Sequence, residues 1–315
     1  MAPPKRDRDL ILQIARMRFE AGRSQRDIAR SLGLSGATIS RALKEAFDLN
    51  LVEVRVLTPP GRDVELERAL MTRFRLVHGV VVETQADPGR TIDVLGRAVA
   101  ETLSFELTDD MTIGVGDGDN AAAVAASLPR LWLNNVEVVP LIGGVGQLEL
   151  ASHPVEVARA LAARLGARVR QLPAPAVAPD AATAAKIIES ATVADAFAAM
   201  ERSAVAVVGV GPINADTSLV KHGALTKEEL DSIAAGGAMG MICARAYDRR
   251  GKHLPSEIDS RTLAIAFDAF KRIPKRWVVA PGLAKAAALR AALAGGIVTA
   301  CGTDTATARE VLRDA

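Results

Sequence analysis

Residues 77–315 repeat one pattern, in which a short run of β-branched and apolar residues ends in glycine and a helical stretch follows. Strands that alternate with helices favour a mostly parallel sheet covered on both faces. We therefore predict an α/β fold for this part. The predicted strands are Val77–Val82, Met111–Val115, Val136–Ile142, Ala204–Val210, Gly237–Ile242, Trp277–Ala280 and Ile297–Ala300, and the predicted helices are Thr91–Leu107, Ala121–Leu128, Pro154–Leu165, Ala181–Met200, Lys227–Ala235, Ser260–Phe270 and Leu283–Ala294.

The predicted strands end in glycine-rich segments. Such sheets bind ligands at the carboxyl ends of their strands, and glycines there let backbone N–H groups converge on an anion at a helix N-terminus. Glycine can equally serve close packing, so one loop is weak evidence, whereas several loops on one edge favour a pocket. The segments are Gly114–Asn120, Gly143–Gln147, Gly209–Asn214, Pro281–Lys285 and Cys301–Asp304.

The loop after the second predicted strand is the most informative. It is not followed by Gly-Lys-Ser/Thr, and it lacks the third glycine of a dinucleotide-binding motif. Asp117 and Asp119 would repel a phosphate and would suit the hydroxyls of a polyol or sugar, although they could also cap the helix. The candidate ligand contacts in these loops are Gly116, Asp117, Gly118, Asp119, Asn120, Gly143, Gly144 and Gln147.

The N-terminal region has the spacing of a helix-turn-helix, whose second helix enters the major groove of DNA. Gly33 stands at the turn, where a positive φ is easy only for glycine, and Ala29 is small where the two helices would cross. A plain three-helix packing unit is the alternative. The predicted elements are a helix from Asp9 to before Gly22, a helix Gln25–Leu32 with Ser24 as N-cap, and a helix Gly36–Ala46 with Ser35 as N-cap.

The exposed positions of this unit are the candidate DNA contacts. Thr38, Ser40 and Arg41 could reach base edges, and Arg41 suits a bidentate contact to guanine. Lys44, Arg23 and Arg26 suit phosphates instead. The full set of predicted DNA-binding residues is Arg23, Ser24, Gln25, Arg26, Ser35, Thr38, Ser40, Arg41 and Lys44.

The chain changes character after the third helix. Leu51–Leu57 alternates like a strand and would form a wing or lead outward. Thr58–Arg62 contains two prolines and a glycine and is predicted to be a linker, and Val64–Phe74 follows as a helix. The predicted domains are therefore a DNA-binding unit at 1–57, a linker and connecting helix at 58–76, and an α/β domain at 77–315.

Charge and composition agree with this division. Residues 1–57 hold 11 Lys/Arg and 7 Asp/Glu, in a chain whose overall net charge is only +2. A basic head suits a phosphate backbone, although ordinary surface charge would look the same. Cys243 and Cys301 lack metal-ligand spacing, and no apolar run approaches a membrane span. We expect a cytoplasmic protein with no cofactor, metal or membrane partner.

Several segments resemble the SorC family of sugar-binding transcriptional regulators. Beside the helix-turn-helix, they are Val138–Gly144, Leu172–Val177, Val207–Gly211, Gly237–Ile242 with Tyr247-Asp248, Val279–Lys285 and Thr303-Asp304. The resemblance implies an effector domain, at 77–315, built like ribose-5-phosphate isomerase and glucosamine-6-phosphate deaminase. It also implies a homo-oligomer, usually a tetramer, that binds operator DNA and a sugar, polyol or sugar phosphate.

The resemblance adds residues to the candidate effector site and marks two departures. Lys285 and the loop Gly116–Asn120 fall where a phosphate or terminal hydroxyl would be held, and Asp248 is a further effector candidate. The family usually has small hydroxyl residues where Asp119 and Asn120 stand, which favours an uncharged sugar or polyol. The family often has an acidic residue where Met241 stands, so one usual ligand contact is absent.

Two other function classes remain open at the level of sequence. A sugar-phosphate isomerase or deaminase on the same fold would need a positioned acid–base pair, and no carboxylate–histidine group stands out at one strand edge. A DNA-binding structural protein without an effector would not need several glycine-rich strand ends. The sequence favours a regulator that is not an enzyme.

Overall fold

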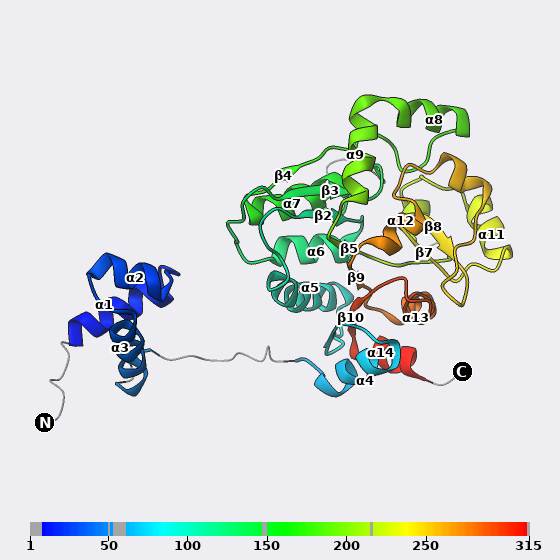
Figure 1. The fold of residues 1–315 in the computed structure, drawn as a ribbon. Coiled ribbons are helices and arrows are strands. Elements are labelled where there is room, and N and C mark those ends of the chain that lie inside the picture. The colour runs from blue at the N-terminus through cyan, green and yellow to red at the C-terminus, as the bar shows by residue number, and fades with distance from the viewer. Residues whose placement is uncertain (1–7, 50, 53–60, 147–149, 215–216, 314–315) are drawn as a thin grey trace, which may run out of the picture. The chain divides into compact units, whose positions relative to one another are not determined.

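A computed structural model describes residues 8–49, 51–52, 61–146, 150–214 and 217–313 (Figure 1). The chain divides into two compact units, Met1–Thr58 and Pro59–Ala315, which we call the head and the body. The strand expected at Leu51–Leu57 lies almost entirely outside the described residues. No helix in the described part of the chain is both long and apolar enough to cross a membrane.

The described residues of the head form three helices, α1 (Arg8–Phe19), α2 (Gln25–Leu32) and α3 (Gly36–Asp48). Each helix buries one apolar stripe against the other two, as the spacing of the sequence predicts. Ile14, Ile28 and Ile39 are fully buried at the centre of this small core. The polar residues of α2 and α3 therefore remain on the outside.

The predicted N-caps of α2 and α3 and the predicted end of α2 are confirmed, whereas α3 runs two residues beyond the predicted Ala46, to Asp48. The Oγ of Ser24 accepts a hydrogen bond from the backbone N–H of Asp27 at 3.1 Å, and the Oγ of Ser35 accepts one from the N–H of Thr38 at 3.1 Å. Gly33 ends α2 with φ of +65°, a left-handed conformation in which glycine has no steric penalty. These contacts fix the turn between the two helices.

The body is built on a seven-stranded sheet in which all neighbouring strands are parallel. Its spatial order is β1-β10-β9-β5-β2-β3-β4. The mostly parallel α/β sheet predicted from the sequence is thus confirmed. The strands are β1 (His78–Val82), β2 (Thr112–Val115), β3 (Glu137–Pro140), β4 (Arg168–Val169), β5 (Val205–Val208), β9 (Lys275–Val279) and β10 (Ala300–Asp304).

Helices cover both faces of this sheet. Alternate strand residues point to opposite sides, so Val80 and Val82 join one hydrophobic cluster and Val81 joins the other. The first face is covered by α5 (Pro88–Ser104), α6 (Asp119–Ser127) and α7 (Pro154–Leu165). The second is covered by α4 (Val64–Phe74), α9 (Ala191–Glu201), α12 (Phe267–Arg272), α13 (Ala286–Ala294) and α14 (Thr305–Leu312).

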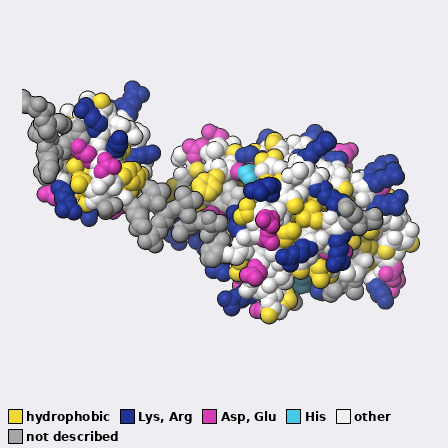
Figure 2. All heavy atoms as spheres, turned by 90° about the horizontal axis from the view of Figure 1, so that it is seen from below, with side chains coloured by type: hydrophobic (Ala, Val, Ile, Leu, Met, Phe, Trp, Pro, Cys, Tyr) yellow, Lys and Arg dark blue, Asp and Glu magenta, His cyan; other side chains and the backbone are white. Residues whose placement is uncertain are grey.

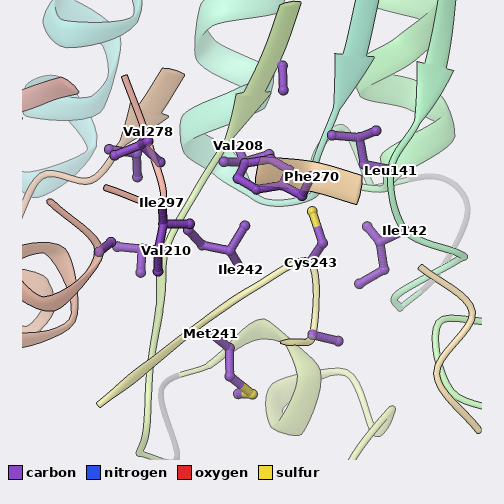
Figure 3. Close-up of a cluster of buried hydrophobic side chains, with 14 of the residues drawn as sticks. Leu141, Ile142, Val208, Val210, Met241, Ile242, Cys243, Phe270, Val278 and Ile297 are labelled. Atoms are coloured by element: carbon purple, nitrogen blue, oxygen red, sulfur yellow. The ribbon is translucent and has the colours of Figure 1, made fainter. Parts of the chain in front are cut away.

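A small antiparallel sheet extends the second face. It has the order β6-β7-β8, and a two-residue turn joins β7 to β8. Its side chains continue the hydrophobic cluster of the main sheet, as Figure 3 shows for Ile242 and Cys243 beside Val208 and Phe270. The elements of this lobe are β6 (Gly211–Pro212), α10 (Ser218–Lys221), α11 (Lys227–Ala235), β7 (Gly240–Ile242), β8 (Arg245–Tyr247) and a 3₁₀ turn at Glu257–Arg261, and α8 (Ala181–Glu189) packs against that 3₁₀ turn.

The structure corrects several predicted elements. The helix expected at Ser260–Phe270 is wrong, because residues 262–266 are extended and form isolated bridges to Ile142 and Val177. The single helix expected at Ala181–Met200 is broken at Ser190, whose ψ of 135° ends α8 and begins α9. The predicted strand Gly237–Ile242 lies in the small sheet and not in the main one.

The C-terminal region also differs from the prediction. The strand expected at Ile297–Ala300 instead runs over Ala300–Asp304, so residues placed in a loop belong to β10. The helix expected from Leu283 begins as a 3₁₀ turn, Leu283–Lys285, before α13. The pattern missed this strand because β10 contains glycine and polar residues, although it pairs with β1 on one side and β9 on the other.

Candidate functional site

The main sheet changes direction between β2 and β5. From β2 the chain continues to β3 and β4 on one side, and from β5 it continues to β9 and β10 on the other. In open α/β sheets the loops diverge at such a switch point and leave a crevice outside the carboxyl ends of the strands. The fold therefore places the loops after β2 and β5 next to a natural ligand site.

A pocket with a cavity volume of about 190 Å³ lies at this point. That volume is small for a ligand site and suits a compact molecule better than a dinucleotide. We call it the switch-point pocket. Its polar lining includes Asp117, Asp119, Asn120, Ser218, Lys221 and Lys285, and its apolar lining includes Val210, Leu219, Met241, Cys243 and Ala244.

The N-terminus of α6 opens into the switch-point pocket. The N–H groups in the first turn of a helix have no intrahelical partner. Gly118, which precedes α6 with φ of +94°, has no side chain that could cap them. Asn120, in that first turn, is only 6% exposed, and its Oδ1 has no hydrogen-bond partner among the described residues. A buried amide oxygen without a partner is costly unless a ligand or water donates to it.

Asp117 is the carboxylate closest to the interior of this site. Its Oδ2 accepts a hydrogen bond of 2.8 Å from the Oγ of Ser218, which ties α10 to the loop after β2. Burial raises the pKa of Asp117 above its ordinary value, although the Ser218 hydrogen bond opposes that shift. The carboxyl is thus held closer to its neutral form than an exposed aspartate would be.

Lys285 brings a cation to the same pocket from the 3₁₀ turn after β9. Burial lowers the pKa of its ammonium, while the nearby Asp119 carboxylate favours the charged form. Lys221 also lines the pocket. The pocket therefore combines two lysines, a helix N-terminus and two aspartates, so it offers donors and acceptors to one ligand.

The structure brings together half of the effector residues predicted from sequence. Asp117, Gly118, Asp119, Asn120 and Lys285 line the switch-point pocket. They come from loops that are more than 160 residues apart in the chain, and the parallel sheet aligns the ends of their strands.

The other predicted effector residues lie elsewhere. Gly116 is buried at the end of β2, where its N–H bonds to the carbonyl of Val207. Gly143 and Gly144 do not line the pocket; a Cβ on Gly143 would lie 2.3 Å from the carbonyl oxygen of Pro175. The Asp248 carboxylate accepts N–H bonds within its own turn, and Gln147 lies outside the described residues.

Sequence reasoning missed much of the apolar side of this pocket. Met241, Cys243 and Ala244 come from the small sheet, and Leu219 comes from α10. Two signals pointed to it: the segment Gly209–Asn214, whose glycines mark the end of β5, and the position of Met241, where the family often has an acidic ligand contact. The small sheet folds back over that end, which an alternating strand–helix pattern does not reveal.

The head presents a second candidate surface on α2 and α3. Ser40, Arg41 and Lys44 are exposed on α3, and Thr38 is half-buried, with its Oγ1 2.8 Å from the Oγ of Ser35. Figure 2 shows Lys and Arg side chains at several places on one face of the head. The remaining predicted DNA contacts, which are Arg23, Ser24, Gln25, Arg26 and Ser35, are also exposed.

Among the histidines of the described residues, His222 lines the switch-point pocket together with Asp117, and its electrostatic interaction with that carboxylate opposes the rise of the Asp117 pKa. His78, His153 and His253 do not line the pocket. His153 caps α7, accepting the N–H of Val155 at its Nδ1, and His78 pairs with Glu106 at 2.9 Å beside Trp277. His253 stacks on Phe267. Within the described ranges, no three His, Cys, Asp or Glu side chains are grouped to hold a metal ion.

Comparisons with known proteins concern both units. A family model described as "Putative sugar-binding domain" matches residues 58–313. The erythritol catabolism regulatory protein EryD of Brucella abortus is 27% identical over 308 residues and is aligned over 97% of each chain. The solved structure of the full-length sorbitol operon regulator SorC from Klebsiella pneumoniae has a TM-score of 0.74 and 27% identity, covering 97% of this chain and 99% of that one. Both proteins are named as regulators and not as enzymes.

Proposed function

The chain belongs to the SorC family of sugar-binding transcriptional regulators, and on that premise we propose that a small sugar, polyol or sugar phosphate in the switch-point pocket controls its affinity for operator DNA. Residues 1–57 would bind the DNA, residues 58–76 would connect the units, and residues 77–315 would bind the effector. The protein would act in the cytoplasm, where its DNA target lies.

One observation supports the effector site most strongly: the Oδ1 of Asn120 has no hydrogen-bond partner within the part of the chain that the structure describes. It is buried at the N-terminus of α6, inside a pocket that also contains Asp117 and Lys285. A sugar hydroxyl could donate to this oxygen and to a carboxylate at the same time. The N–H groups of α6 and the Lys285 ammonium would donate hydrogen bonds to an oxygen of the effector, charged or neutral.

The charge of the pocket bears on whether the effector carries a phosphate. Asp119 is exposed and lies close enough to Lys285 to favour the charged ammonium, so each charge offsets the other. Burial disfavours the charged form of Asp117. The pocket would therefore repel a phosphate less strongly than two ionised aspartates would. For this reason both phosphorylated and free sugars should be tested as effectors.

DNA recognition would use the outer face of α3. Its N-terminal half holds Thr38, Ser40 and Arg41, the positions that a recognition helix presents to base edges. The Arg41 Nε donates to the carbonyl of Ala37 at 3.2 Å, and the side chain is exposed, so the terminal nitrogens of the guanidinium could contact a base edge. Lys44, Arg23 and Arg26 would contact phosphates on either side.

Oligomerisation would join two or more heads on one operator. We expect a homo-oligomer, a tetramer as in the family resemblance, because paired heads read half-sites one helical turn or a multiple of it apart. Light scattering coupled to size-exclusion chromatography measures the mass directly. A monomer at micromolar concentration, with and without DNA, would remove this part of the proposal.

The test combines DNA binding with an effector panel. In an electrophoretic mobility-shift assay, the protein should bind a labelled DNA fragment from upstream of the gene. At least one compound from a panel of polyols, free sugars and sugar phosphates should change the affinity of the protein for this fragment. Asp119→Ala should weaken the effector response about tenfold or more, since it removes a charged hydrogen-bond acceptor, and should leave DNA affinity unchanged. Asp231→Ala, exposed on α11, is the matched control.

The outcomes separate the two halves of the proposal. Absence of a shift with any upstream fragment argues against a DNA-binding regulator. A normal shift with an undiminished response of Asp119→Ala shows that the effector binds elsewhere. Turnover of a sugar phosphate by the purified protein would instead support an isomerase or deaminase.

A further inference from the structure

The lining of the switch-point pocket contains residues of two kinds. The polar groups come from the loop after β2, from α10 and from Lys285, and a second set of lining residues is apolar, each 9% exposed or less. We call this second set the apolar wall. Its members are Val210, Leu219, Met241, Cys243 and Ala244.

Two members of the apolar wall have a strained backbone. Cys243 and Ala244 form the whole turn between β7 and β8, with φ values of +47° and +58°. Two positive φ values are typical of a type I′ turn, which asparagine and glycine normally occupy. Side chains with a Cβ are disfavoured there, and such strain persists where the surrounding structure holds it and often at functional sites.

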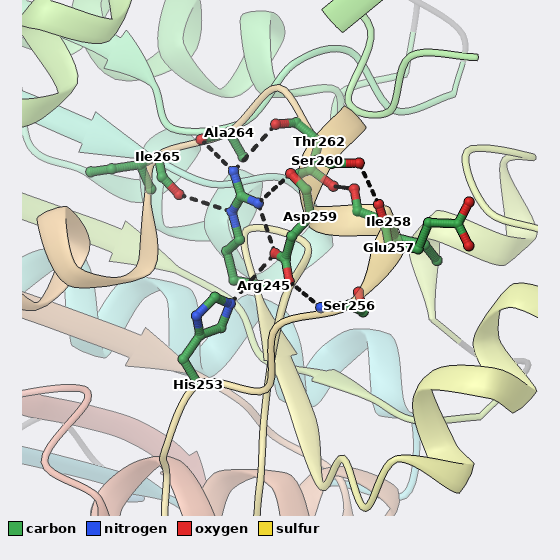
Figure 4. Close-up of polar contacts among 10 residues, drawn as sticks. All are labelled: Arg245, His253, Ser256, Glu257, Ile258, Asp259, Ser260, Thr262, Ala264 and Ile265. Carbon is green, nitrogen blue, oxygen red and sulfur yellow. Dashed lines mark hydrogen bonds and ion pairs between the residues drawn. The ribbon is translucent and has the colours of Figure 1, made fainter. Parts of the chain in front are cut away.

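Arg245 holds the strained turn from one side. It follows Ala244 directly, and its guanidinium donates to the Asp259 carboxylate at 2.7 Å and to the carbonyls of Thr262 and Ala264 at 3.2 Å each (Figure 4). The Asp259 carboxylate also accepts the N–H of Ser256 at 2.8 Å. The turn is therefore fixed to the extended segment 262–266.

The core holds the turn from the other side. The sulfur of Cys243 points toward Phe270, with Leu141 and Ile142 nearby (Figure 3). Burial raises the pKa of this thiol well above its ordinary value, so it stays neutral. The side chains of the wall are thus uncharged, and the turn that carries Cys243 and Ala244 is preformed.

We propose that the apolar wall is the specificity-determining surface of the pocket, and that it selects effectors which turn a deoxygenated carbon or a C–H face toward it. This inference rests on the proposed function of the pocket. A ligand held by the polar groups has one face against the wall. A hydroxyl buried on that face would lose its bonds to water and gain none, which costs binding affinity about tenfold or more.

The experiment uses pairs of sugars that differ by one hydroxyl. The pairs are 2-deoxy-D-ribose 5-phosphate with D-ribose 5-phosphate, L-fucose with L-galactose, and L-rhamnose with L-mannose. Titration calorimetry on the full-length protein should show that, in at least one pair, the deoxy member binds about tenfold tighter. The same member should change operator affinity at lower concentration.

Two pairs of variants test the wall itself. Ala244→Ser and Met241→Gln each add a polar group to the wall, and we expect each to reduce the preference for the deoxy member about fivefold or more. Ala244→Gly and Met241→Leu add none and should retain the preference. Operator affinity without effector should be the same for all four variants, which also verifies folding.

Each outcome has a definite reading. Equal binding within every pair, binding of hydroxylated members only, or silence toward all six sugars overturns the specificity proposal. A deoxy preference that both polar variants leave intact also overturns it. None of these results removes the proposed function, which depends on operator binding and on the wider effector panel.

Discussion

At the scale of single residues, Asp304 shows how the carboxyl edge of the sheet is held. It is 1% exposed, and its carboxylate accepts hydrogen bonds from the hydroxyls of Thr84 and Thr307, both at 2.6 Å. It also accepts the N–H of Gly282 at 2.7 Å. One side chain thus joins the loops after β1 and β9 to the start of α14, close to the turn that carries Lys285.

Asp304 should make stability depend on pH. Burial alone would raise its pKa, but the hydrogen bonds outweigh burial, and the pKa lies below its ordinary value. The resulting stabilisation is complete above the pKa of the unfolded chain, about 4, and is lost as the pH falls through the folded pKa. Asp304→Asn should therefore lower the free energy of unfolding by about 1–3 kcal/mol at pH 7, and by less at pH 3.

Urea denaturation at several pH values measures this difference. Asp231→Asn, on an exposed position of α11, should change stability little at any pH. If the loss in Asp304→Asn were the same at pH 3 and pH 7, the ionised carboxylate would not be the stabilising species.

Arg41 is the residue on which sequence-specific DNA binding should depend. Replacing it with alanine should weaken binding to the operator by about 1–3 kcal/mol and relax specificity at one base pair. Lys44→Ala should instead weaken binding to all sequences alike. It should also reduce the slope of log binding constant against log salt concentration by about one, because one phosphate contact is lost. Fluorescence anisotropy with operator and scrambled duplexes separates the two, and a uniform loss for Arg41→Ala would assign it to a phosphate.

At the scale of elements, local sequence signals predict the structure where no distant partner overrides them. Ser24, Gly33 and Ser35 fix α2 and α3, because caps act on their own helix. The helix prediction over residues 262–266 is wrong, because the carbonyls of Thr262 and Ala264 accept hydrogen bonds from Arg245. A local apolar pattern does not reveal such a distant partner. The apolar wall was missed for the same reason, since β7 and β8 form their own sheet.

The β7–β8 turn contains Ala244 at a position where glycine should give a more stable protein. Ala244→Gly removes the steric penalty of φ +58°, so the free energy of unfolding should rise by roughly 1 kcal/mol. Ala246→Gly, in the adjacent strand β8, should lower it, because glycine weakens a strand and a buried methyl group is lost. Chemical denaturation of both variants tests the strain, and a destabilised Ala244→Gly would show that the turn is relaxed.

At the scale of the whole molecule, the fold class and the division into two units follow from patterns repeated along the chain. The alternation of strands and helices identifies the parallel sheet. It does not give the strand order, and so the meeting of Asp117 with Ser218 and Lys285 could not be derived. Positions in a pocket depend on which strand ends are neighbours, and that is a property of topology.

Coupling between the units should be reciprocal. If an effector lowers operator affinity by a given factor, the operator must lower effector affinity by the same factor. We expect a factor of about 5–150, equivalent to 1–3 kcal/mol. Effector titrations with and without saturating operator measure it, and a factor of one would mean that the effector site and the DNA-binding surface are not coupled.

The pairing of β1 with β10 has a consequence for synthesis on the ribosome. His78–Val82 bonds along its length to Ala300–Asp304, which are translated more than 200 residues later. Until they emerge, β1 has no partner within the main sheet. The nascent protein would then expose this apolar strand after the head has been translated, so we expect the body to need chaperone protection until β10 has emerged.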